Sequence, residues 1–302
     1  MYSQQNITLY AVQKKAVQLT FHRCDGSTWQ KTTLAKGSSY SLPGVRDAEG
    51  YTFMGWSTKP MQSVSPQYEA EEKITVNGNV DLYAVVFNRT TETDLTEDQL
   101  PQVDIYKYKQ VIFVGDSRTE FMENVLTGMG ESATKNVKFV CSAGKGLDWF
   151  TTTGWAQLYS IVQHDSNSIL SKKTAVIFNF GVNDLSKSAD YAEYYNWIAP
   201  QLKSKGCELY FMSVNPVNRL MLPNAGRADR SEAAVRSFNQ YMKANLSSAY
   251  TYIDMYSYLK STGYSFASDH YGTGTVDDGL HYTTRTYKRI FAKCMDSLRV
   301  PA

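Results

Sequence analysis

The chain has 302 residues, of which 42% are hydrophobic and 20% are charged, and its formal net charge is +2 at pH 7. This length leaves room for two domains with a sizeable core, and the near-neutral charge gives no electrostatic argument for binding nucleic acid or an acidic surface. The sequence lacks an apolar run of about 18 residues and a charged-then-apolar leader at Met1, so no transmembrane span or signal peptide is expected in this chain.

The four cysteines are scattered along the sequence, with no Cys-x-x-Cys pair and no clustered histidines beside them. A zinc site is therefore not expected, and the sequence predicts neither a metal nor an organic cofactor. Buried free thiols are the default interpretation for the three cysteines in predicted strands and helices, which are Cys141, Cys207 and Cys294.

The N-terminal part of the chain has a β-rich pattern and a partial internal repeat. Residues 17–21 alternate apolar and polar side chains, as expected for a strand that is buried on one face. Residues 6–12 (NITLYAV) match residues 79–85 (NVDLYAV). We therefore predict that residues 1–15 end a preceding repeat and that residues 16–88 form one whole repeat.

Three runs inside this repeat carry a resemblance to a known module: residues 37–43 (GSSYSLP), 50–57 (GYTFMGWS) and 81–84 (DLYA). Together they resemble the internalin-type B repeat, a small β-grasp-like module of bacterial surface and secreted proteins. The resemblance implies an extracellular setting and a spacer or adhesive role, without catalysis.

The pattern changes twice after the repeat. Residues 89–108 are rich in Thr, Asp and Glu and contain Pro101, so they are predicted to be a linker or a strand-like tether. From residue 109 to residue 302, apolar strands alternate with amphipathic helices. This alternation predicts an α/β domain with a flavodoxin-like, three-layer α/β/α arrangement around a parallel sheet. Strands are expected at residues 111–114, 137–141, 175–180, 208–214 and 252–254, and helices at about 155–162, 189–205, 231–246 and 283–298.

The first strand of this domain ends in Gly115-Asp116-Ser117, and a helical pattern follows at once. A serine at this position places its hydroxyl at the edge of the sheet where open α/β proteins carry their active sites. The N–H groups at the start of the helix are suited to binding an oxyanion. Taken alone, the motif is explained equally well by Asp116 or Ser117 acting only as a helix cap.

Three further motifs lie where they would meet Ser117 at the same edge of the sheet. The second predicted strand ends in a glycine-rich turn, residues 142–149 (SAGKGLDW), and the third ends in residues 181–184 (GVND). Residues 277–282 (DDGLHY) come just before the last helix. The order and spacing of these motifs resemble those of the SGNH hydrolases, also called the GDSL esterase/lipase superfamily, over residues 109–298.

This resemblance implies a catalytic triad of Ser117, Asp278 and His281. A serine hydroxyl needs a base to accept its proton, and an Asp three residues before the His would hold the imidazole in the required tautomer. The family pattern also implies an oxyanion hole formed by the Ser117 backbone N–H, a glycine N–H from Gly146 and the side-chain amide of Asn183.

Several alternatives stay open at this point. Asp277 competes with Asp278 as the residue that orients the imidazole, and Gly144 competes with Gly146 in the oxyanion hole. Asp116 and Asp184 are expected to be structural. The three histidines that lack a motif, His22, His164 and His270, are interpreted as surface or packed residues.

Arg118 stands where the name-giving motif has leucine, which weakens the usual inference that the substrate is a lipid. Arg118 either binds an anionic group of the substrate or pairs with a neighbouring acid, and we prefer the second interpretation. The sequence contains no Gly-x-Ser-x-Gly elbow, which argues against the ordinary α/β-hydrolase family.

We therefore predict a serine esterase that removes short acyl groups such as acetate from a carbohydrate or cell-envelope polymer. The expected substrate follows from the implied extracellular setting and from the 22 Tyr and 5 Trp residues, whose flat rings suit contact with sugars. The protein is expected to be bacterial, secreted or on the cell surface, and attached through neighbouring repeats or domains. The alternatives are an acyltransferase that uses the same triad and a catalytically idle adhesion module.

Overall fold

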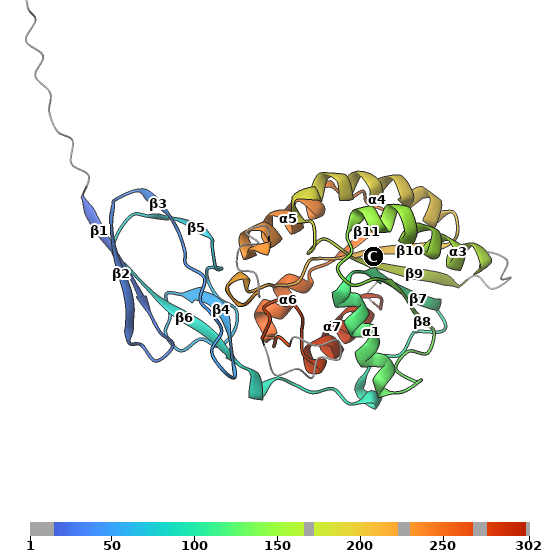
Figure 1. Cartoon of the computed structure of the whole chain (residues 1–302), viewed down its shortest axis with the longest axis horizontal. Helices are drawn as coiled ribbons and strands as arrows, with labels where there is room; N and C mark the ends of the chain where they lie inside the picture. The colour runs from blue at the N-terminus through green and yellow to red at the C-terminus, as the bar shows by residue number, and fades with distance from the viewer. Residues whose placement is uncertain (1–14, 166–171, 223–229, 268–276, 300–302) are drawn as a thin grey trace, which may run out of the picture.

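A computed structural model describes residues 15–165, 172–222, 230–267 and 277–299. Its N-terminal part is a four-stranded mixed sheet in the order β2-β1-β6-β4, in which the first and last strands of the repeat, β1 and β6, are parallel neighbours (Figure 1). The strands are β1 (Ala16–His22), β2 (Thr28–Ala35), β4 (Tyr51–Ser57) and β6 (Val80–Asn88), and a two-stranded sheet of β3 (Ser38–Ser41) and β5 (Lys73–Val76) lies beside them.

The C-terminal part is built on a five-stranded sheet in which every pair of neighbours is parallel. The strand order is β11-β10-β9-β7-β8, so the first strand along the chain lies between the second and the third. The strands are β7 (Tyr108–Gly115), β8 (Val137–Cys141), β9 (Lys173–Asn179), β10 (Cys207–Met212) and β11 (Tyr250–Ile253). This is the flavodoxin-like order, and it confirms the predicted fold class.

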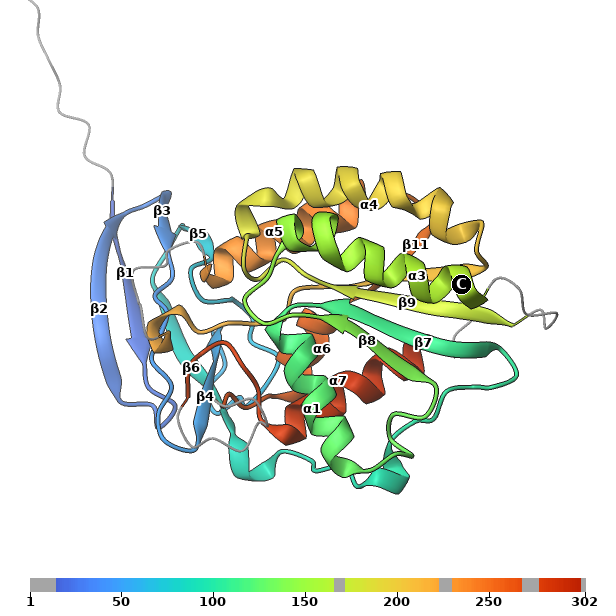
Figure 2. The ribbon, with the colours of Figure 1, turned by 45° about the vertical axis from the view of Figure 1, so that its right-hand side comes forward.

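Helices cover both faces of this sheet (Figures 1 and 2). Side chains alternate along β7, so Val111 and Phe113 pack into one core while Ile112 and Val114 pack into the other. The first core is closed by α1 (Ser117–Met129), α6 (Met255–Thr262) and α7 (Thr284–Ser297), and the second by α3 (Trp155–Asp165), α4 (Ser188–Lys203) and α5 (Glu232–Asn245). Two helices were not expected from the sequence: α6 and the short α2 (Leu147–Trp149), which runs through a π-helical turn into α3.

The two sheets share one of these cores. Met54, Val85 and Phe87, from β4 and β6, are buried in the same cluster as Phe113 of β7. A Cβ atom added at Gly263 would lie only 2.3 Å from the Phe87 ring, which shows how closely the two parts approach. The repeat and the α/β domain are therefore packed together rather than merely joined.

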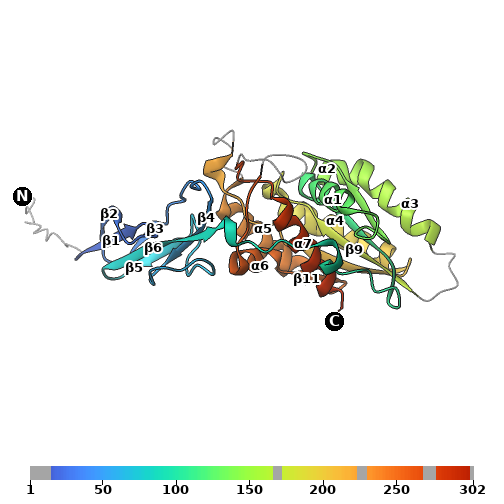
Figure 3. The same cartoon turned by 90° about the horizontal axis from the view of Figure 1, so that it is seen from below.

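The segment predicted as a linker also packs against the α/β domain. It contains two short 3-10 helices, Arg89–Thr91 and Glu97–Gln99, and it runs along the domain to β7 (Figures 1 and 3). Leu100 and Val103 are buried in the shared core. Among the described residues, no helix combines the length and apolarity needed to cross a membrane. All four cysteines are free thiols.

Candidate active site

The turn between β7 and α1 places Ser117 at the carboxyl edge of the sheet. A Cβ atom at Gly115 would lie 2.0 Å from Oγ1 of Thr119, so only glycine fits this close approach of strand and helix. Asp116 then caps α1, its side chain accepting a 3.0 Å hydrogen bond from the Arg118 N–H. Ser117 is the first residue of the helix, where backbone N–H groups have no partner within the helix.

Three side chains predicted from the sequence form a continuous hydrogen-bonded chain. Nε2 of His281 lies 2.9 Å from Oγ of Ser117, and Nδ1 of His281 lies 2.7 Å from Oδ2 of Asp278. An ionised carboxylate only accepts hydrogen bonds, so Nδ1 carries the proton and Nε2 is left to accept the serine hydroxyl. This arrangement gives the tautomer that a general base needs.

The orientation of both partners is fixed locally. Oδ1 of Asp278 accepts hydrogen bonds from the N–H groups of Leu280, at 2.9 Å, and His281, at 2.8 Å. The carboxylate therefore turns its other oxygen toward the imidazole. The His281 ring stacks on Phe121, with 4.4 Å between ring centroids.

The structure also separates the roles of the two neighbouring aspartates. Asp278 contacts His281, whereas the carboxylate of Asp277 contacts Arg89 and accepts a 2.8 Å hydrogen bond from the N–H of Gly279. The choice of Asp278 over Asp277 as the partner of the imidazole agrees with this geometry.

Asn183 lies against the glycine-rich turn that follows β8. Its Nδ2 donates a 2.7 Å hydrogen bond to the carbonyl of Lys145, and its Oδ1 accepts a 2.6 Å hydrogen bond from Arg230. A primary amide nitrogen carries two hydrogens, and the contact with Lys145 uses one of them. The same turn is joined to β7 by a 3.3 Å bond from the Ser142 N–H to the Gly115 carbonyl.

The two candidate glycines of this turn have different surroundings. A Cβ atom at Gly146 would lie 2.4 Å from Oδ2 of Asp184, whereas nothing lies within 4 Å of a Cβ atom at Gly144. Asp184 accepts hydrogen bonds from the Leu147 N–H, at 2.9 Å, and from the Tyr191 hydroxyl, at 2.7 Å. Its contacts are those of a residue that holds the turn in place, as expected.

Asp116, the cap of α1, is buried beside the site. Burial raises its pKa to about 6, although the positive charge of Arg118 and the hydrogen bond from the Arg118 N–H act in the opposite direction. The contact with the Arg118 N–H supports a structural role for this carboxylate.

Arg118 has a role that the sequence analysis missed. Its guanidinium is buried and donates to three backbone carbonyls, those of Leu280 at 3.0 Å, Asn215 at 3.0 Å and Pro216 at 2.9 Å. Instead of facing the substrate, the side chain ties α1 to the segment that carries His281. The neighbouring Tyr282 ring lies 5.2 Å from the guanidinium carbon.

The remaining histidines do not join the site where the structure describes them. His22 contacts Asp81 at 2.9 Å and stacks on Tyr83 in the repeat. His270 and the side chain of His164 lie outside the described residues. The described part of the chain contains no cluster of three or more metal-ligating side chains.

Two family models match the sequence. Residues 18–85 match the Listeria-Bacteroides repeat domain, which confirms the predicted repeat under a broader name than the internalin-type B repeat. Residues 111–294 match the GDSL-like lipase/acylhydrolases. The sequence matches no curated protein.

Similar solved structures include other SGNH-type proteins at low identity. A protein from Slackia heliotrinireducens described as an SGNH hydrolase is 13% identical over 64% of this chain and 100% of its own, with a TM-score of 0.46. An acetyl xylan esterase is 11% identical over 63% and 99%, with a TM-score of 0.42. The C-terminal catalytic domain of peptidoglycan O-acetyltransferase A from Streptococcus pneumoniae is 16% identical over 64% and 94%, with a TM-score of 0.38. Because its model covers more than half of the sequence, the chain belongs to the GDSL-like lipase/acylhydrolase family.

Proposed function

We propose that this protein is a serine esterase in which Ser117, His281 and Asp278 act together. The observation that carries the proposal is the chain of two hydrogen bonds, 2.9 and 2.7 Å long, from the Ser117 hydroxyl through His281 to Asp278. Oγ of Ser117 attacks the ester carbonyl while Nε2 of His281 takes its proton and passes it to the leaving alcohol. Water then attacks the acyl-enzyme while Nε2 of His281 takes a proton from it. His281 returns this proton to Oγ of Ser117 as the acid is released.

The negative charge that develops on the carbonyl oxygen needs donors beside Ser117. We assign this role to the Ser117 N–H at the start of α1, the N–H of Gly146 and the side-chain amide of Asn183. The position of Ser117 in the helix and the contact of Asn183 with the glycine turn support this assignment. Loss of one such donor typically lowers kcat by about 10²–10³.

The proposed substrate is a short acyl ester, such as an acetyl group, on a carbohydrate or cell-envelope polymer. The match of residues 18–85 to a Listeria-Bacteroides repeat supports an extracellular bacterial setting in which such polymers occur. The abundance of aromatic residues supports it less, because many of these rings, including Tyr191, Tyr195 and Tyr282, are buried. We propose that neighbouring repeats or domains attach the enzyme to the cell surface.

The nucleophile is tested by Ser117→Ala. This variant should lower kcat for p-nitrophenyl acetate by at least about 10³-fold and abolish labelling by a fluorophosphonate probe. Thr33→Ala, an exposed position of β2, serves as the control and should behave as the parent protein does. Hydrolysis that persists undiminished in Ser117→Ala would remove Ser117 as the nucleophile.

The substrate is tested by comparing acetylated xylan and O-acetylated peptidoglycan with a long-chain ester. Release of acetate from one of the polymers, at a higher kcat/KM than for the long-chain ester, is the expected result. Product analysis with an added acceptor sugar distinguishes hydrolysis from acyl transfer, since a transferase would pass the acyl group to a sugar hydroxyl instead of water.

A further inference from the structure

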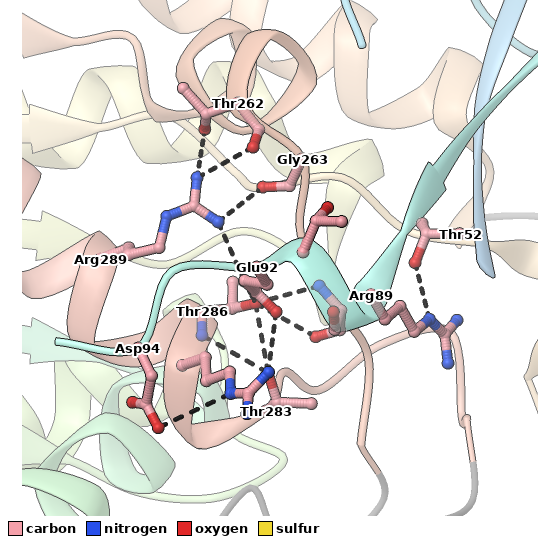
Figure 4. Close-up of polar contacts among 12 residues, drawn as sticks. Thr52, Arg89, Glu92, Asp94, Thr262, Gly263, Thr283, Thr286 and Arg289 are labelled. Atoms are coloured by element: carbon pink, nitrogen blue, oxygen red, sulfur yellow. Dashed lines mark hydrogen bonds and ion pairs between the residues drawn. The ribbon is translucent and has the colours of Figure 1, made fainter. Parts of the chain in front are cut away.

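The loop that carries Asp278 and His281 is held by a segment that precedes the α/β domain. We call residues 277–283 the His281 loop and residues 89–94 the strap. The strap leaves the end of β6 and crosses the start of α7, where the His281 loop ends (Figure 4). It contacts the loop at both ends.

At the start of the loop, Arg89 joins two carboxylates from different parts of the chain. Its Nη2 contacts Asp277 and lies 3.0 Å from Oδ2 of Asp47, while its Nε donates a 2.9 Å hydrogen bond to Oγ1 of Thr52 (Figure 4 shows the last contact). The side chains of Asp47 and Asp277 are 0% and 8% exposed. The strap, held by Asp47 and Thr52 of the repeat, therefore contacts the loop one residue before Asp278.

At the end of the loop, Glu92 contacts the first two turns of α7 (Figure 4). Its carboxylate accepts hydrogen bonds from the hydroxyl of Thr286 and from Nη1 of Arg289, the latter at 2.9 Å, and its Oε2 lies 3.4 Å from the hydroxyl of Thr283. The Glu92 and Arg289 side chains are 1% and 7% exposed, so this ion pair is buried.

Asn218 supports the middle of the loop from the same side. Its backbone N–H donates a 2.8 Å hydrogen bond to the carbonyl of Gly279, and its Nδ2 donates to Oδ1 of Asp47 at 2.9 Å. Gly279 has φ +65°, and a Cβ atom there would lie 2.2 Å from the Asn218 carbonyl oxygen. Asp47 of the repeat is thus linked to the loop through Asn218 as well as through Arg89.

The buried ion pairs of the strap are unlike the solvent-exposed charges of a flexible linker. Removing charged groups from water is costly unless each is paired, and the ion pairs that Arg89 and Glu92 each make fix the strap against the α/β domain. A Ser–His–Asp chain depends on a defined geometry, because a displacement of about 1 Å can lower the rate by about 10²-fold.

We propose that the strap, together with Asp47, positions the His281 loop against Ser117, so that Arg89 and Glu92 are positioning residues of the esterase. This proposal rests on the proposed function. The repeat then contributes to the geometry of the active site as well as being a surface module. Its packing against the His281 loop determines how well Nε2 of His281 is aligned with the serine hydroxyl.

The raised pKa of Asp47 agrees with its burial between the repeat and the His281 loop. Burial, followed by the hydrogen bond and negative charge of Asp277, holds the pKa of Asp47 well above its ordinary value. Nη2 of Arg89 lies against both carboxyl groups, so its positive charge is placed where the two acidic side chains meet.

The most direct test is Asp277→Ala, which removes the contact with Arg89 and the hydrogen bond from the Gly279 N–H but leaves the contact between Arg89 and Asp47 in place. We expect kcat for p-nitrophenyl acetate to fall by about 10–100-fold with KM little changed, because the loop loses its position rather than a contact with the substrate. Asp277→Asn keeps an oxygen that accepts from Arg89 and Gly279 and should recover most of the loss.

Arg236→Ala is the matched control. Arg236 of α5 donates a 2.9 Å hydrogen bond to the Ala70 carbonyl, so it crosses between the same two parts of the chain without touching the His281 loop. Its kcat should equal that of the parent protein. If Arg236→Ala lowers kcat as much as Asp277→Ala does, the effect is one of general docking and the proposal fails.

A double-mutant cycle separates positioning through this contact from unrelated damage. Arg89→Ala should lower kcat about as much as Asp277→Ala, and the double variant should be no worse than either single variant. Additive losses would overturn the proposal. Arg89→Met, which keeps an unbranched side chain but has no donor for either carboxylate, gives the same comparison if Arg89→Ala does not fold.

A readout that needs no substrate distinguishes this proposal from the proposed function. The Nδ1 proton of His281, bonded to Asp278, is expected to give a strongly downfield NMR signal that broadens or disappears in Asp277→Ala. An unchanged signal would overturn the role of the strap, even if the protein hydrolysed esters. Failure of the proposed function would instead show as a parent protein that neither hydrolyses esters nor is labelled at Ser117.

Discussion

The two sheets of this protein are buried in different ways. The central strands of the parallel sheet are apolar on both faces. For example, β7 packs into two cores, one on each side of the sheet. In the mixed sheet, β2 is largely exposed, whereas β4 is buried along almost its whole length. The repeat thus behaves as an ordinary surface sheet at one edge and as part of the hydrolase at the other.

The second face of β4 and β6 explains this contrast. Phe53 and Trp56 of β4 face the repeat's own core, while Met54 faces the core shared with the α/β domain. An antiparallel sheet normally leaves one face in water. Here that face packs against residues of α6 and α7 in the shared core. This packing of the repeat on the α/β domain also brings the strap next to the His281 loop.

The largest effect is expected from Phe87→Ala, which opens a cavity in the shared core. Phe87 is 6% exposed, and its loss should lower the free energy of unfolding by about 3–5 kcal/mol in urea titrations. Thr33→Ala on exposed β2 is the control and should stay within about 0.5 kcal/mol. Equal effects of the two substitutions would mean that the face of the repeat sheet packed on the α/β domain contributes no more to stability than the exposed strand β2 does.

Gly263→Ala tests the same contact from the other side. Gly263 ends α6 with φ +81°, and an added Cβ atom would meet the Phe87 ring at 2.3 Å. Overpacking and the strained backbone should together lower the free energy of unfolding by about 2–4 kcal/mol. In a Phe87→Ala background the ring is gone, so the added cost of Gly263→Ala should shrink. A cost that is unchanged there would show that the ring does not limit this position.

A smaller effect is expected at Asp116, the buried carboxylate at the edge of the parallel sheet. Because its folded-state pKa of about 6 lies above its ordinary value of 3.8, the folded state binds the proton more tightly. The stability of the parent protein should therefore contain a contribution that falls as the pH rises through this window.

Asp116→Asn removes this contribution while keeping a good helix cap. Between about pH 4 and about pH 7, its free energy of unfolding should gain about 1–3 kcal/mol relative to the parent protein. Urea titrations at the two pH values provide the measurement. A constant difference between the two proteins would show that Asp116 does not titrate as described.

The sequence predicts the parallel sheet well because its strands are continuous apolar runs, such as residues 111–114 and 175–178. It also predicts the residues that meet at Ser117, since the Asp278-x-x-His281 pair is local and parallel strands end at the same edge. The short α6 was missed, because eight residues give little helical periodicity.

The strap and Arg118 could not be predicted from local pattern. Glu92 and Arg289 are charged residues that usually lie in water, and only their pairing across the fold allows them to be buried. Arg118 is bound by carbonyl groups, which every residue has, so no side-chain motif marks its partners. A threonine- and acid-rich run therefore resembled a linker, although it carries buried contacts.

The parallel pairing of β1 with β6 determines the distance between the points where the chain enters and leaves the repeat. Parallel neighbours run in the same direction, so the chain enters the sheet at one end of β1 and leaves it at the opposite end of β6. The nine residues of β6 span about 30 Å at roughly 3.3 Å per residue. A tandem array of such modules would lengthen by about that distance with each further copy. The number of copies would then set the distance between the α/β domain and the far end of the array.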